Sequence, residues 1–184
     1  KGIKNALTAE IDKDVDSFFA LFADNVKRHG TPALPKRYFA LLKHTFGADC
    51  EVLTVRHEGR SISSVLTFYF RDEVLPYYAG DSEDARQLAA NDFKYWELMR
   101  RACERGYRVF DYGRSKRGTG QFDFKKNWGF EPQPLHYEYF LVTAPGVPEH
   151  NPTNPKYRLF IKLWKRLPTP VANFLGPHIV KHLG

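Results

Sequence analysis

The spacing of hydrophobic residues divides the first part of the chain into two helices. In residues 14–28 the apolar side chains recur every three or four positions, which predicts one amphipathic helix. Residues 35–46 predict a second, shorter helix, because Pro35 suits a first helical turn and Gly47 suits a C-terminal cap. The apolar positions of the first helix are Val15, Phe18, Phe19, Phe22 and Val26.

The period then changes to that of β-strands. Residues 51–57 alternate, and residues 62–70 are rich in β-branched and aromatic side chains, with a turn at 58–60 between them. Residues 74–79 predict a third strand. Together these stretches predict an antiparallel meander.

A longer helical stretch and shorter elements follow the meander. Asp81 or Ser82 can cap a helix that extends to about Arg105. The stretch 108–112 is typical of a short central strand. A glycine-bearing loop, a short helix over 122–128 and a last strand over 134–142 complete the predicted order.

Length and proline distribution predict one domain with a C-terminal extension. A chain of 184 residues with 42% hydrophobic residues can bury one α/β core, which we place in residues 1–143. Residues 144–155 contain four prolines and predict a linker. Residues 156–184 predict a basic, amphipathic helical segment, with one helix over 156–167 and a weaker one after Pro170.

The cysteines and the lack of a long apolar run predict where the protein is located, and the first residue bears on whether the chain is complete. Cys50 and Cys103 lie in apolar runs without metal-ligand spacing, so we expect reduced packing residues and no metal site. No apolar run approaches the ~20 residues that a membrane span needs, which favours a cytoplasmic location. The chain begins at Lys1 rather than at methionine, which suggests that an upstream part is missing.

Positive charge is concentrated in two places. The net charge is +7, residues 100–126 hold nine Lys and Arg against three acids, and residues 151–184 hold six against none. Localised positive charge favours a polyanionic ligand such as a pyrophosphate, a tRNA backbone or a membrane surface. A solvated basic face is the equally open alternative.

Residues 91–139 carry a more specific signal. A helix ends in ACERGY, a strand ends in FDYGRS, and FKKNWGF precedes the last predicted strand. This pattern resembles the FemAB-related acyltransferases of the GNAT superfamily, in particular the branch associated with exosortase (PEP-CTERM) exopolysaccharide systems.

The resemblance implies a fold, an arrangement of domains and a catalytic residue. It implies an α+β (α/β) GNAT-like fold with a mixed, mostly antiparallel sheet flanked by helices. Fem proteins consist of two tandem GNAT-like halves, so this chain would be the C-terminal half and its N-terminal half would be absent. In the second half a lysine of the FK motif lies near the acyl donor, which corresponds to Lys125, with Lys126 as the adjacent alternative.

The segment after the third meander strand bears on the donor. CoA-dependent GNAT enzymes hold a pyrophosphate there with a glycine-rich loop, whereas residues 78–84 contain one glycine and three carboxylates. This composition argues against ordinary acetyl-CoA use and agrees with an aminoacyl-tRNA donor, as in Fem proteins. The acids could instead simply favour the helix N-terminus, which is compatible with both donors. We expect no tightly bound cofactor.

Several residues are candidates for the site. Asp111 ends a strand expected to be buried, so it needs a partner such as Arg114 or a backbone N–H, and it is either a structural ion pair or a general base. Arg114, Lys116 and Arg117 lie in a loop with three glycines, which fits either a phosphate site or a surface turn.

Lys125 is too basic to act as a base, but as a cation it can stabilise an oxyanion or a leaving ribose oxygen; the alternative is a surface lysine. Lys126 would bind substrate beside it. Tyr78 and Tyr137 line a substrate cleft or belong to the core, as strand aromatics more often do.

The expected activity is transfer of an acyl or aminoacyl group to an amine of a cell-envelope or exopolysaccharide precursor. Two alternatives stay open, namely a non-catalytic module that binds a polyanion such as tRNA or a nucleotide-sugar, and an ordinary acetyl-CoA-dependent N-acetyltransferase. The helix over 156–167 can dock on the missing half or lie on the inner face of the membrane.

Overall fold

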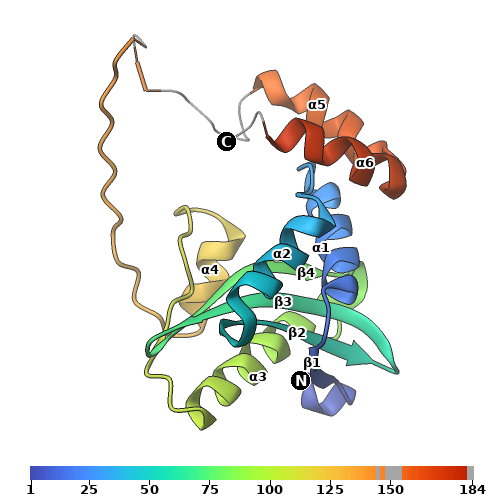
Figure 1. Cartoon of the computed structure of the whole chain (residues 1–184), viewed down its shortest axis with the longest axis vertical. Coiled ribbons are helices and arrows are strands. Elements are labelled where there is room, and N and C mark those ends of the chain that lie inside the picture. Colours follow the sequence, from blue (N-terminus) through green and yellow to red (C-terminus); the bar gives the residue numbers. More distant parts are fainter. Residues whose placement is uncertain (144–145, 148–154, 182–184) are drawn as a thin grey trace.

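The computed structural model describes residues 1–143, 146–147 and 155–181, and its elements follow the predicted order closely (Figure 1). They are β1 (Thr8–Asp12), α1 (Asp16–His29), α2 (Lys36–Phe46), β2 (Cys50–His57), β3 (Arg60–Phe70), β4 (Glu73–Asp81), α3 (Ala90–Glu104), β5 (Val109–Phe110), α4 (Gly120–Asn127), α5 (Pro155–Arg166) and α6 (Thr169–Val180), with short 3-10 turns at Ile3–Asn5, Gly47–Asp49 and Glu83–Arg86.

The five strands form one sheet in the order β1-β2-β3-β4-β5. The first four are antiparallel neighbours, which confirms the predicted meander, and β5 is parallel to β4. Strand β1 was not predicted, because it is a short edge strand in which only Ala9 and Ile11 are apolar. The mixed, mostly antiparallel sheet confirms the expected fold class.

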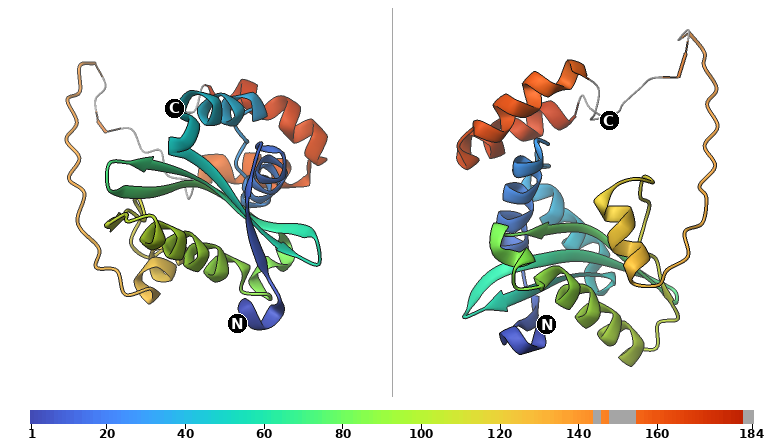
Figure 2. Two further views of the ribbon diagram at one scale, coloured as in Figure 1. Left: turned by 60° about the horizontal axis from the view of Figure 1, so that its bottom comes forward. Right: turned by 180° about the vertical axis from the view of Figure 1, so that it is seen from behind.

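Helices cover both faces of the sheet (Figure 2). On one face α1 and α2 pack their phenylalanines, including Phe18, Phe22 and Phe39, against inward residues such as Val52 and Leu66. On the other face α3 packs through residues such as Phe93 and Leu98. These contact the adjacent strand residues that point the opposite way, among them Leu53 of β2 and Val65 of β3. Successive side chains of β2 and β3 point to opposite faces of the sheet, so the same two strands contribute to two separate hydrophobic cores.

One glycine sets the distance between α1 and the sheet. A Cβ at Gly80 in β4 would lie 2.4 Å from the Cα and N atoms of Phe22 in α1. Only glycine permits backbone contact this close. The end of β4 is therefore held directly beneath α1.

Two expectations about the α3 region are wrong. The predicted helix from Asp81 or Ser82 to Arg105 is broken, because Ala89 adopts a left-handed conformation (φ 56°) and α3 starts only at Ala90. A 3-10 turn, Glu83–Arg86, fills the gap. Cys50 is buried as expected, whereas Cys103 lies on the exposed side of α3.

The predicted strand over residues 134–142 is also wrong. This stretch is exposed and pairs with no strand, because its course leads away from the β5 edge, where a partner would have to lie (Figure 1). The predicted linker over 144–155 falls mostly outside the described residues. The two C-terminal helices are present as α5 and α6.

A buried ion pair joins the end of β4 to α3. The Lys94 side chain is fully buried, and its Nζ donates to Asp81 Oδ1 at 2.8 Å. The hydroxyl of Ser63 donates to the same carboxylate oxygen, and the Arg28 guanidinium donates to the Asp81 carbonyl. Four charged or polar groups from α1, β3, β4 and α3 therefore meet at one point.

This environment controls the protonation of Asp81. Burial by itself raises the pKa of its carboxyl, but the charge and hydrogen bond of Lys94, the Ser63 hydroxyl and the charge of Arg28 together hold the pKa below its ordinary value of 3.8. The carboxylate is therefore ionised in the folded protein at neutral pH. Its pairing stabilises the fold above the unfolded-state pKa, and this contribution is lost as pH falls through the folded-state pKa.

We predict that Asp81→Asn destabilises the fold strongly, because it leaves the Lys94 ammonium buried without a counter-charge. Loss of one partner of a buried pair costs about 3 kcal/mol or more. Urea unfolding should show this loss from pH 5 to pH 8, and the difference from wild type should shrink only as the pH falls below 3.8 and through the lowered folded-state pKa of Asp81, where the wild-type carboxyl takes up its proton. Glu104→Gln, which breaks the solvent-exposed pair with Arg100, is the control and should change little. Equal effects of the two variants would contradict the assigned role of the buried pair.

Candidate active site

The strands β4 and β5 diverge soon after they begin. They pair only at Glu73↔Val109 and Val74↔Phe110, and the Asp111 N–H then donates to the Val74 carbonyl at 2.9 Å. The next β4 residue with its backbone directed to the same side is Pro76, which has no N–H to donate. The edge of β4 from Leu75 to Asp81 therefore has no strand beside it among the described residues.

A β-bulge marks the same stretch of β4. Leu66 of β3 pairs with Tyr78, whereas the following Thr67 pairs with Pro76, so Tyr77 is an extra residue. Bulges redirect side chains and interrupt pairing, and they are frequent next to active sites. Bulge and proline together leave backbone groups along this edge of β4 unpaired within the described residues, and such groups can hydrogen-bond to an extended ligand.

Aromatic side chains from α3, α4 and the segments that follow β5 and α4 gather where the strands separate. The rings of Tyr112 and Tyr95 stack at 4.8 Å, and Phe124 of α4 lies 5.6 Å from Tyr95. Phe130, beyond α4, packs edge-on against Tyr112 at 4.8 Å. Tyr112 follows the last hydrogen bond between the diverging segments, so its ring stands at the vertex of the divergence.

The Tyr112 hydroxyl is the unusual atom of this cluster. Tyr112 is only 9% exposed, and its Oη has no hydrogen-bond partner among the described residues. Burial is the largest cause that raises the pKa of Tyr112, and burial likewise raises the pKa of Tyr95 to about 12. Both phenols are therefore protonated at neutral pH and can donate but not abstract a proton.

Lys125 of α4 lies over the same cluster. Its Nζ is 5.8 Å from the centre of the Tyr112 ring, and it donates to the carbonyls of Gly113 at 3.1 Å and Arg114 at 3.2 Å. Partial burial lowers the pKa of Lys125 from 10.5, while the charge of Asp111 opposes this shift. The ammonium therefore fixes the loop after β5 and remains beside the Tyr112 ring. Its catalytic role stays a prediction.

Asp111 differs from its predicted setting. The residue is exposed rather than buried, because β5 ends at Phe110 and Asp111 already faces away from the core. Of its two predicted partners, the backbone N–H is the one observed, since Gly113 N donates to Asp111 Oδ1 at 2.7 Å. The geometry is that of an Asx turn, which supports the structural role more than the general-base role.

The predicted cationic residues lie in the loop between β5 and α4 and on α4. Arg114, Lys116, Arg117 and Lys126 are all exposed. Thr119 orders the loop, because its hydroxyl donates to the Lys116 carbonyl at 2.7 Å and accepts from Phe122 N at 3.3 Å as the helix cap. The cations are thus presented to solvent around an ordered turn, which is compatible with a polyanionic ligand.

The structure brings one predicted aromatic residue to these cations and separates the other from them. A hydrogen bond with the Tyr137 side chain is the largest cause that raises the pKa of Arg114, so these two residues lie together. Tyr78 instead packs under α1 and α2, with its hydroxyl 3.2 Å from that of Tyr38. Tyr78 thus belongs to the core on the face opposite α3, and the expectation that it lines the cleft has no support here.

The carboxylates after β4 do not form the repulsive cluster that their sequence suggests. Asp81 faces Lys94, and Asp84 accepts from the Arg60 guanidinium and from Ser82 Oγ at 2.5 Å. Hydrogen bonds and the charge of Arg60 lower the pKa of Asp84. Two of the three acids are therefore neutralised by cations. These carboxylates would repel a pyrophosphate much less than their sequence suggests.

The start of α3 is covered by another part of the chain. Asn5 Nδ2 donates to the Leu88 carbonyl at 2.9 Å, and Gly2 packs against the Phe93 ring. A pocket of about 230 Å³ lies beside this contact, lined by Lys1, Gly2, Ile3, Asp92, Phe93, Trp96 and Trp128. Its aromatic walls suit a small ring, while the charges of Lys1 and Asp92 oppose each other.

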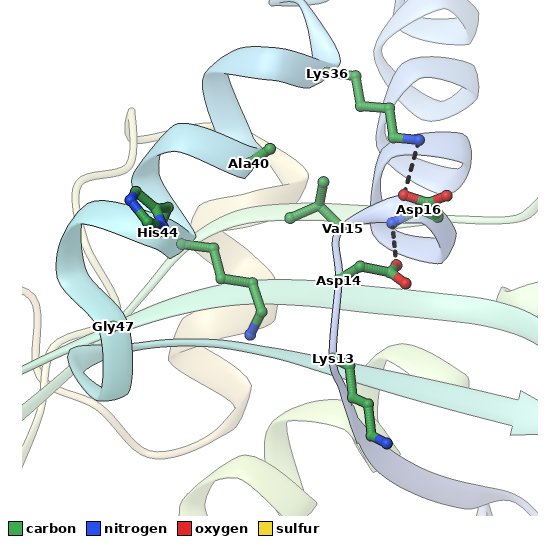
Figure 3. A pocket seen from close by; sticks show the side chains of 9 residues that line it. Lys13, Asp14, Val15, Asp16, Lys36, Ala40, His44 and Gly47 are labelled. Carbon is green, nitrogen blue, oxygen red and sulfur yellow. Dashed lines mark hydrogen bonds and ion pairs between the residues drawn. The ribbon is translucent and has the colours of Figure 1, made fainter.

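A larger pocket lies at the β1 edge of the sheet, away from β5 (Figure 3). It has a volume of about 520 Å³ and is lined by Lys13, Asp14, Val15, Asp16, Lys36, Ala40, Lys43, His44 and Gly47. Two of its charges already pair with each other, since Lys36 Nζ lies 2.8 Å from Asp16 Oδ1. Asp14 accepts from the Asp16 N–H at 2.8 Å, so it serves as a local cap.

Sequence reasoning missed Lys94, Tyr95 and Tyr112. Lys94 and Tyr95 lie in a helix whose surface would ordinarily carry lysine, and nothing in the local pattern shows that Asp81 folds back to meet Lys94. Tyr112 lies within the FDYGRS motif, directly between the selected Asp111 and Arg114. The sequence analysis assigned it no role, because the burial of its hydroxyl, without a partner among the described residues, is visible only in three dimensions.

Solved structures share this fold. An aminoglycoside acetyltransferase from an uncultured soil metagenomic sample, in complex with sisomicin, aligns with a TM-score of 0.58 at 15% identity over 76% of this chain and 99% of that one. A ribosomal-protein-alanine N-acetyltransferase from Brucella melitensis biovar Abortus 2308 aligns with a TM-score of 0.55 at 12% identity over 73% and 99%. At these identities the likeness concerns the fold alone.

A third solved structure, the ribosomal-protein-S18-alanine N-acetyltransferase from Escherichia coli, aligns with a TM-score of 0.53 at 16% identity over 74% of this chain and 85% of that one. No protein of curated function matches the chain by sequence. The sequence profile of the acetyltransferase (GNAT) domain, however, matches residues 5–126, which is more than half of the chain and includes β1 to α4. Acetyltransferases of this kind take their acyl group from acyl-CoA without a tightly bound cofactor. The chain therefore belongs to the GNAT acetyltransferase family and is an N-acyltransferase.

Proposed function

We propose that this chain acylates an amine of a cell-envelope or exopolysaccharide precursor, with the reaction centred where β4 and β5 diverge. The observation that carries this proposal is the bare β4 edge from Leu75 to Asp81, which adjoins Tyr112 and the Lys125 ammonium. The acceptor class rests on the resemblance of residues 91–139 to FemAB-related acyltransferases.

Acyl transfer to an amine needs an aligned donor, a stabilised oxyanion and a protonated leaving group. The free backbone of β4 can align a donor that carries amide groups, as an added strand would be aligned. The Lys125 ammonium can stabilise the oxyanion or the leaving oxygen. The Tyr112 phenol, whose Oη has no partner among the described residues, can supply the proton that the leaving group takes up.

The cationic loop gives the site a place for phosphate groups. Arg114, Lys116 and Arg117 surround the same turn whose carbonyls bind Lys125. A pyrophosphate of a nucleotide-sugar or lipid-linked precursor, or the phosphates of a tRNA donor, would be attracted to them. A second, upstream GNAT-like half would complete the walls of such a site.

A second candidate function is that of an ordinary acetyl-CoA-dependent N-acetyltransferase. It is favoured by the pairing of Asp81 with Lys94 and of Asp84 with Arg60, which removes most of the negative charge from the expected pyrophosphate position. The cover that Gly2 and Asn5 place over the start of α3 favours the first proposal instead, because it restricts access to the helix N–H groups.

Calorimetric titration with CoA distinguishes the two donors. We expect no binding tighter than a dissociation constant of about 1 μM, because one glycine and a covered helix start do not form a pyrophosphate cradle. Titration with uncharged tRNA in the same buffer is the comparison. Submicromolar CoA binding would establish the second candidate in place of an aminoacyl-tRNA donor.

We predict that Lys125→Ala lowers turnover about a hundredfold, the usual effect of removing one group that stabilises an oxyanion. The turnover is measured as the rate of acyl transfer to an amine acceptor, with acetyl-CoA or aminoacyl-tRNA as the donor. Lys126→Ala is the matched control, since Lys126 is the next residue and is exposed, and it should retain most of the activity. Loss of activity in Lys126→Ala but not in Lys125→Ala would show that Lys126, and not Lys125, stabilises the oxyanion.

We predict that Tyr112→Phe lowers kcat about a hundredfold, as expected for loss of a general acid, with little change in KM. The free energy of unfolding should stay the same or rise, because the deleted hydroxyl is buried and, within the described residues, has no hydrogen-bond partner. Tyr95→Phe, in the ring stacked on Tyr112, is the control for packing. An unchanged kcat in a folded Tyr112→Phe protein would remove Tyr112 from the mechanism.

A further inference from the structure

The C-terminal helices α5 and α6 form a pair that docks on the end of α1 (Figures 1 and 2). Trp164 of α5 is buried, and its Nε1 donates to the Thr31 carbonyl at 3.2 Å. Gly30 lies against Ile161, and Gly176 of α6 lies against the backbone of Ala33. One side of each helix is thus occupied by the GNAT domain of the same chain.

The opposite side of the pair exposes large apolar side chains. Leu159 is 68% exposed, Leu163 56% and Phe174 71%, although residues of this size are ordinarily withdrawn from water. The remaining members of this apolar surface are Phe160, Val171 and Leu175. Both α5 and α6 contribute side chains to this apolar surface, because each helix docks on α1 through its opposite side.

The segment that carries this apolar surface has charges of only one sign in its sequence. Residues 151–184 contain six Lys and Arg and no Asp or Glu. Lys162 and Arg166 of α5 and Lys181 after α6 are exposed beside the apolar side chains. An apolar surface bordered only by cations is typical of segments that lie in the interface of an anionic bilayer.

We propose that α5 and α6 bind the surface of a membrane that contains anionic phospholipid. A second copy of the chain is a poor occupant, because two such surfaces would bring their cations together. Among the described residues, none of the helices combines the length and apolarity needed to cross a bilayer. The pair therefore inserts the side chains of Leu159, Leu163 and Phe174 between headgroups while the cations contact lipid phosphates.

Attachment through this pair leaves the candidate active site uncovered. The pair sits on α1, whereas α4 and the loop that precedes it lie on the other side of the molecule, away from α5 and α6 (Figure 1). The inference is independent of the proposed function, because it uses no residue of the site and applies whatever the acyl donor is.

Cosedimentation of the whole chain with vesicles tests this proposal. We expect binding to equimolar phosphatidylglycerol and phosphatidylcholine that weakens as salt is raised, and at least tenfold weaker binding to pure phosphatidylcholine. Equal binding to both compositions, or no binding to either, would overturn the proposal. The second outcome would favour an acidic protein as the partner instead.

Two variants separate the apolar and charged contributions. Leu163→Ser combined with Phe174→Ser should weaken binding at least tenfold, and Lys162→Glu combined with Arg166→Glu should abolish the preference for phosphatidylglycerol. Phe70→Ser is the control, since Phe70 is 66% exposed at the end of β3 and should be without effect. Circular dichroism confirms that each variant is folded. Wild-type binding by both double variants would refute the role of this surface, as would a loss in the Phe70 control equal to theirs.

Discussion

The structure depends on the unequal use of the two edges of β4. One edge is paired with β3 along its length, whereas the other pairs with β5 for two residues and then has no strand beside it in the described part of the chain. Pro76 removes the next donor and Tyr77 adds an unpaired residue, so the divergence is built into the covalent chain. Gly80 and the Asp81–Lys94 pair hold the far end of the same strand against α1 and α3. The free edge is therefore rigid on both sides, which is what alignment of a reacting group requires.

The chemical character of the site follows from what surrounds that edge. The groups nearest to the vertex are a buried phenol and a lysine whose ammonium binds backbone carbonyls. Neither is a base at neutral pH, so the site can stabilise negative charge and donate a proton but does not itself deprotonate the amine. An acceptor that reaches the site must then lose its proton to water or to a group outside this cluster.

The N-acyltransferase domain and the C-terminal helices divide the positive charge between them. The loop between β5 and α4 presents cations around an ordered turn, while α5 and α6 present cations around exposed leucine and phenylalanine. The first arrangement suits soluble phosphates and the second a lipid surface. If the acceptor is lipid-linked, both surfaces would act on one molecule, with its headgroup at the loop and its membrane under the helices.

Local pattern alone was sufficient for most of the elements. The helices α1, α2 and α4 and the meander β2 to β4 were predicted from periodicity and turn residues, because each depends on contacts between near neighbours in the chain. The FDYGRS and FKKNWGF motifs likewise located the loop and the helix that carry Lys125. The strand predicted over residues 134–142 failed, because a strand requires a partner and no local signal shows whether one is within reach.

Only the tertiary structure decided how these residues meet. Asp81 was grouped with two other acids by sequence, yet its carboxylate faces a lysine thirteen residues away that is fully buried. Tyr78 packs in the core under α1 and α2, whereas Tyr112, in the loop after β5, stacks on Tyr95 of α3 on the other side of the sheet. The sequence determined which groups are present and in which element each lies. Their pairing, burial and protonation depend on distances between segments far apart in the chain, which the sheet and its covering helices set.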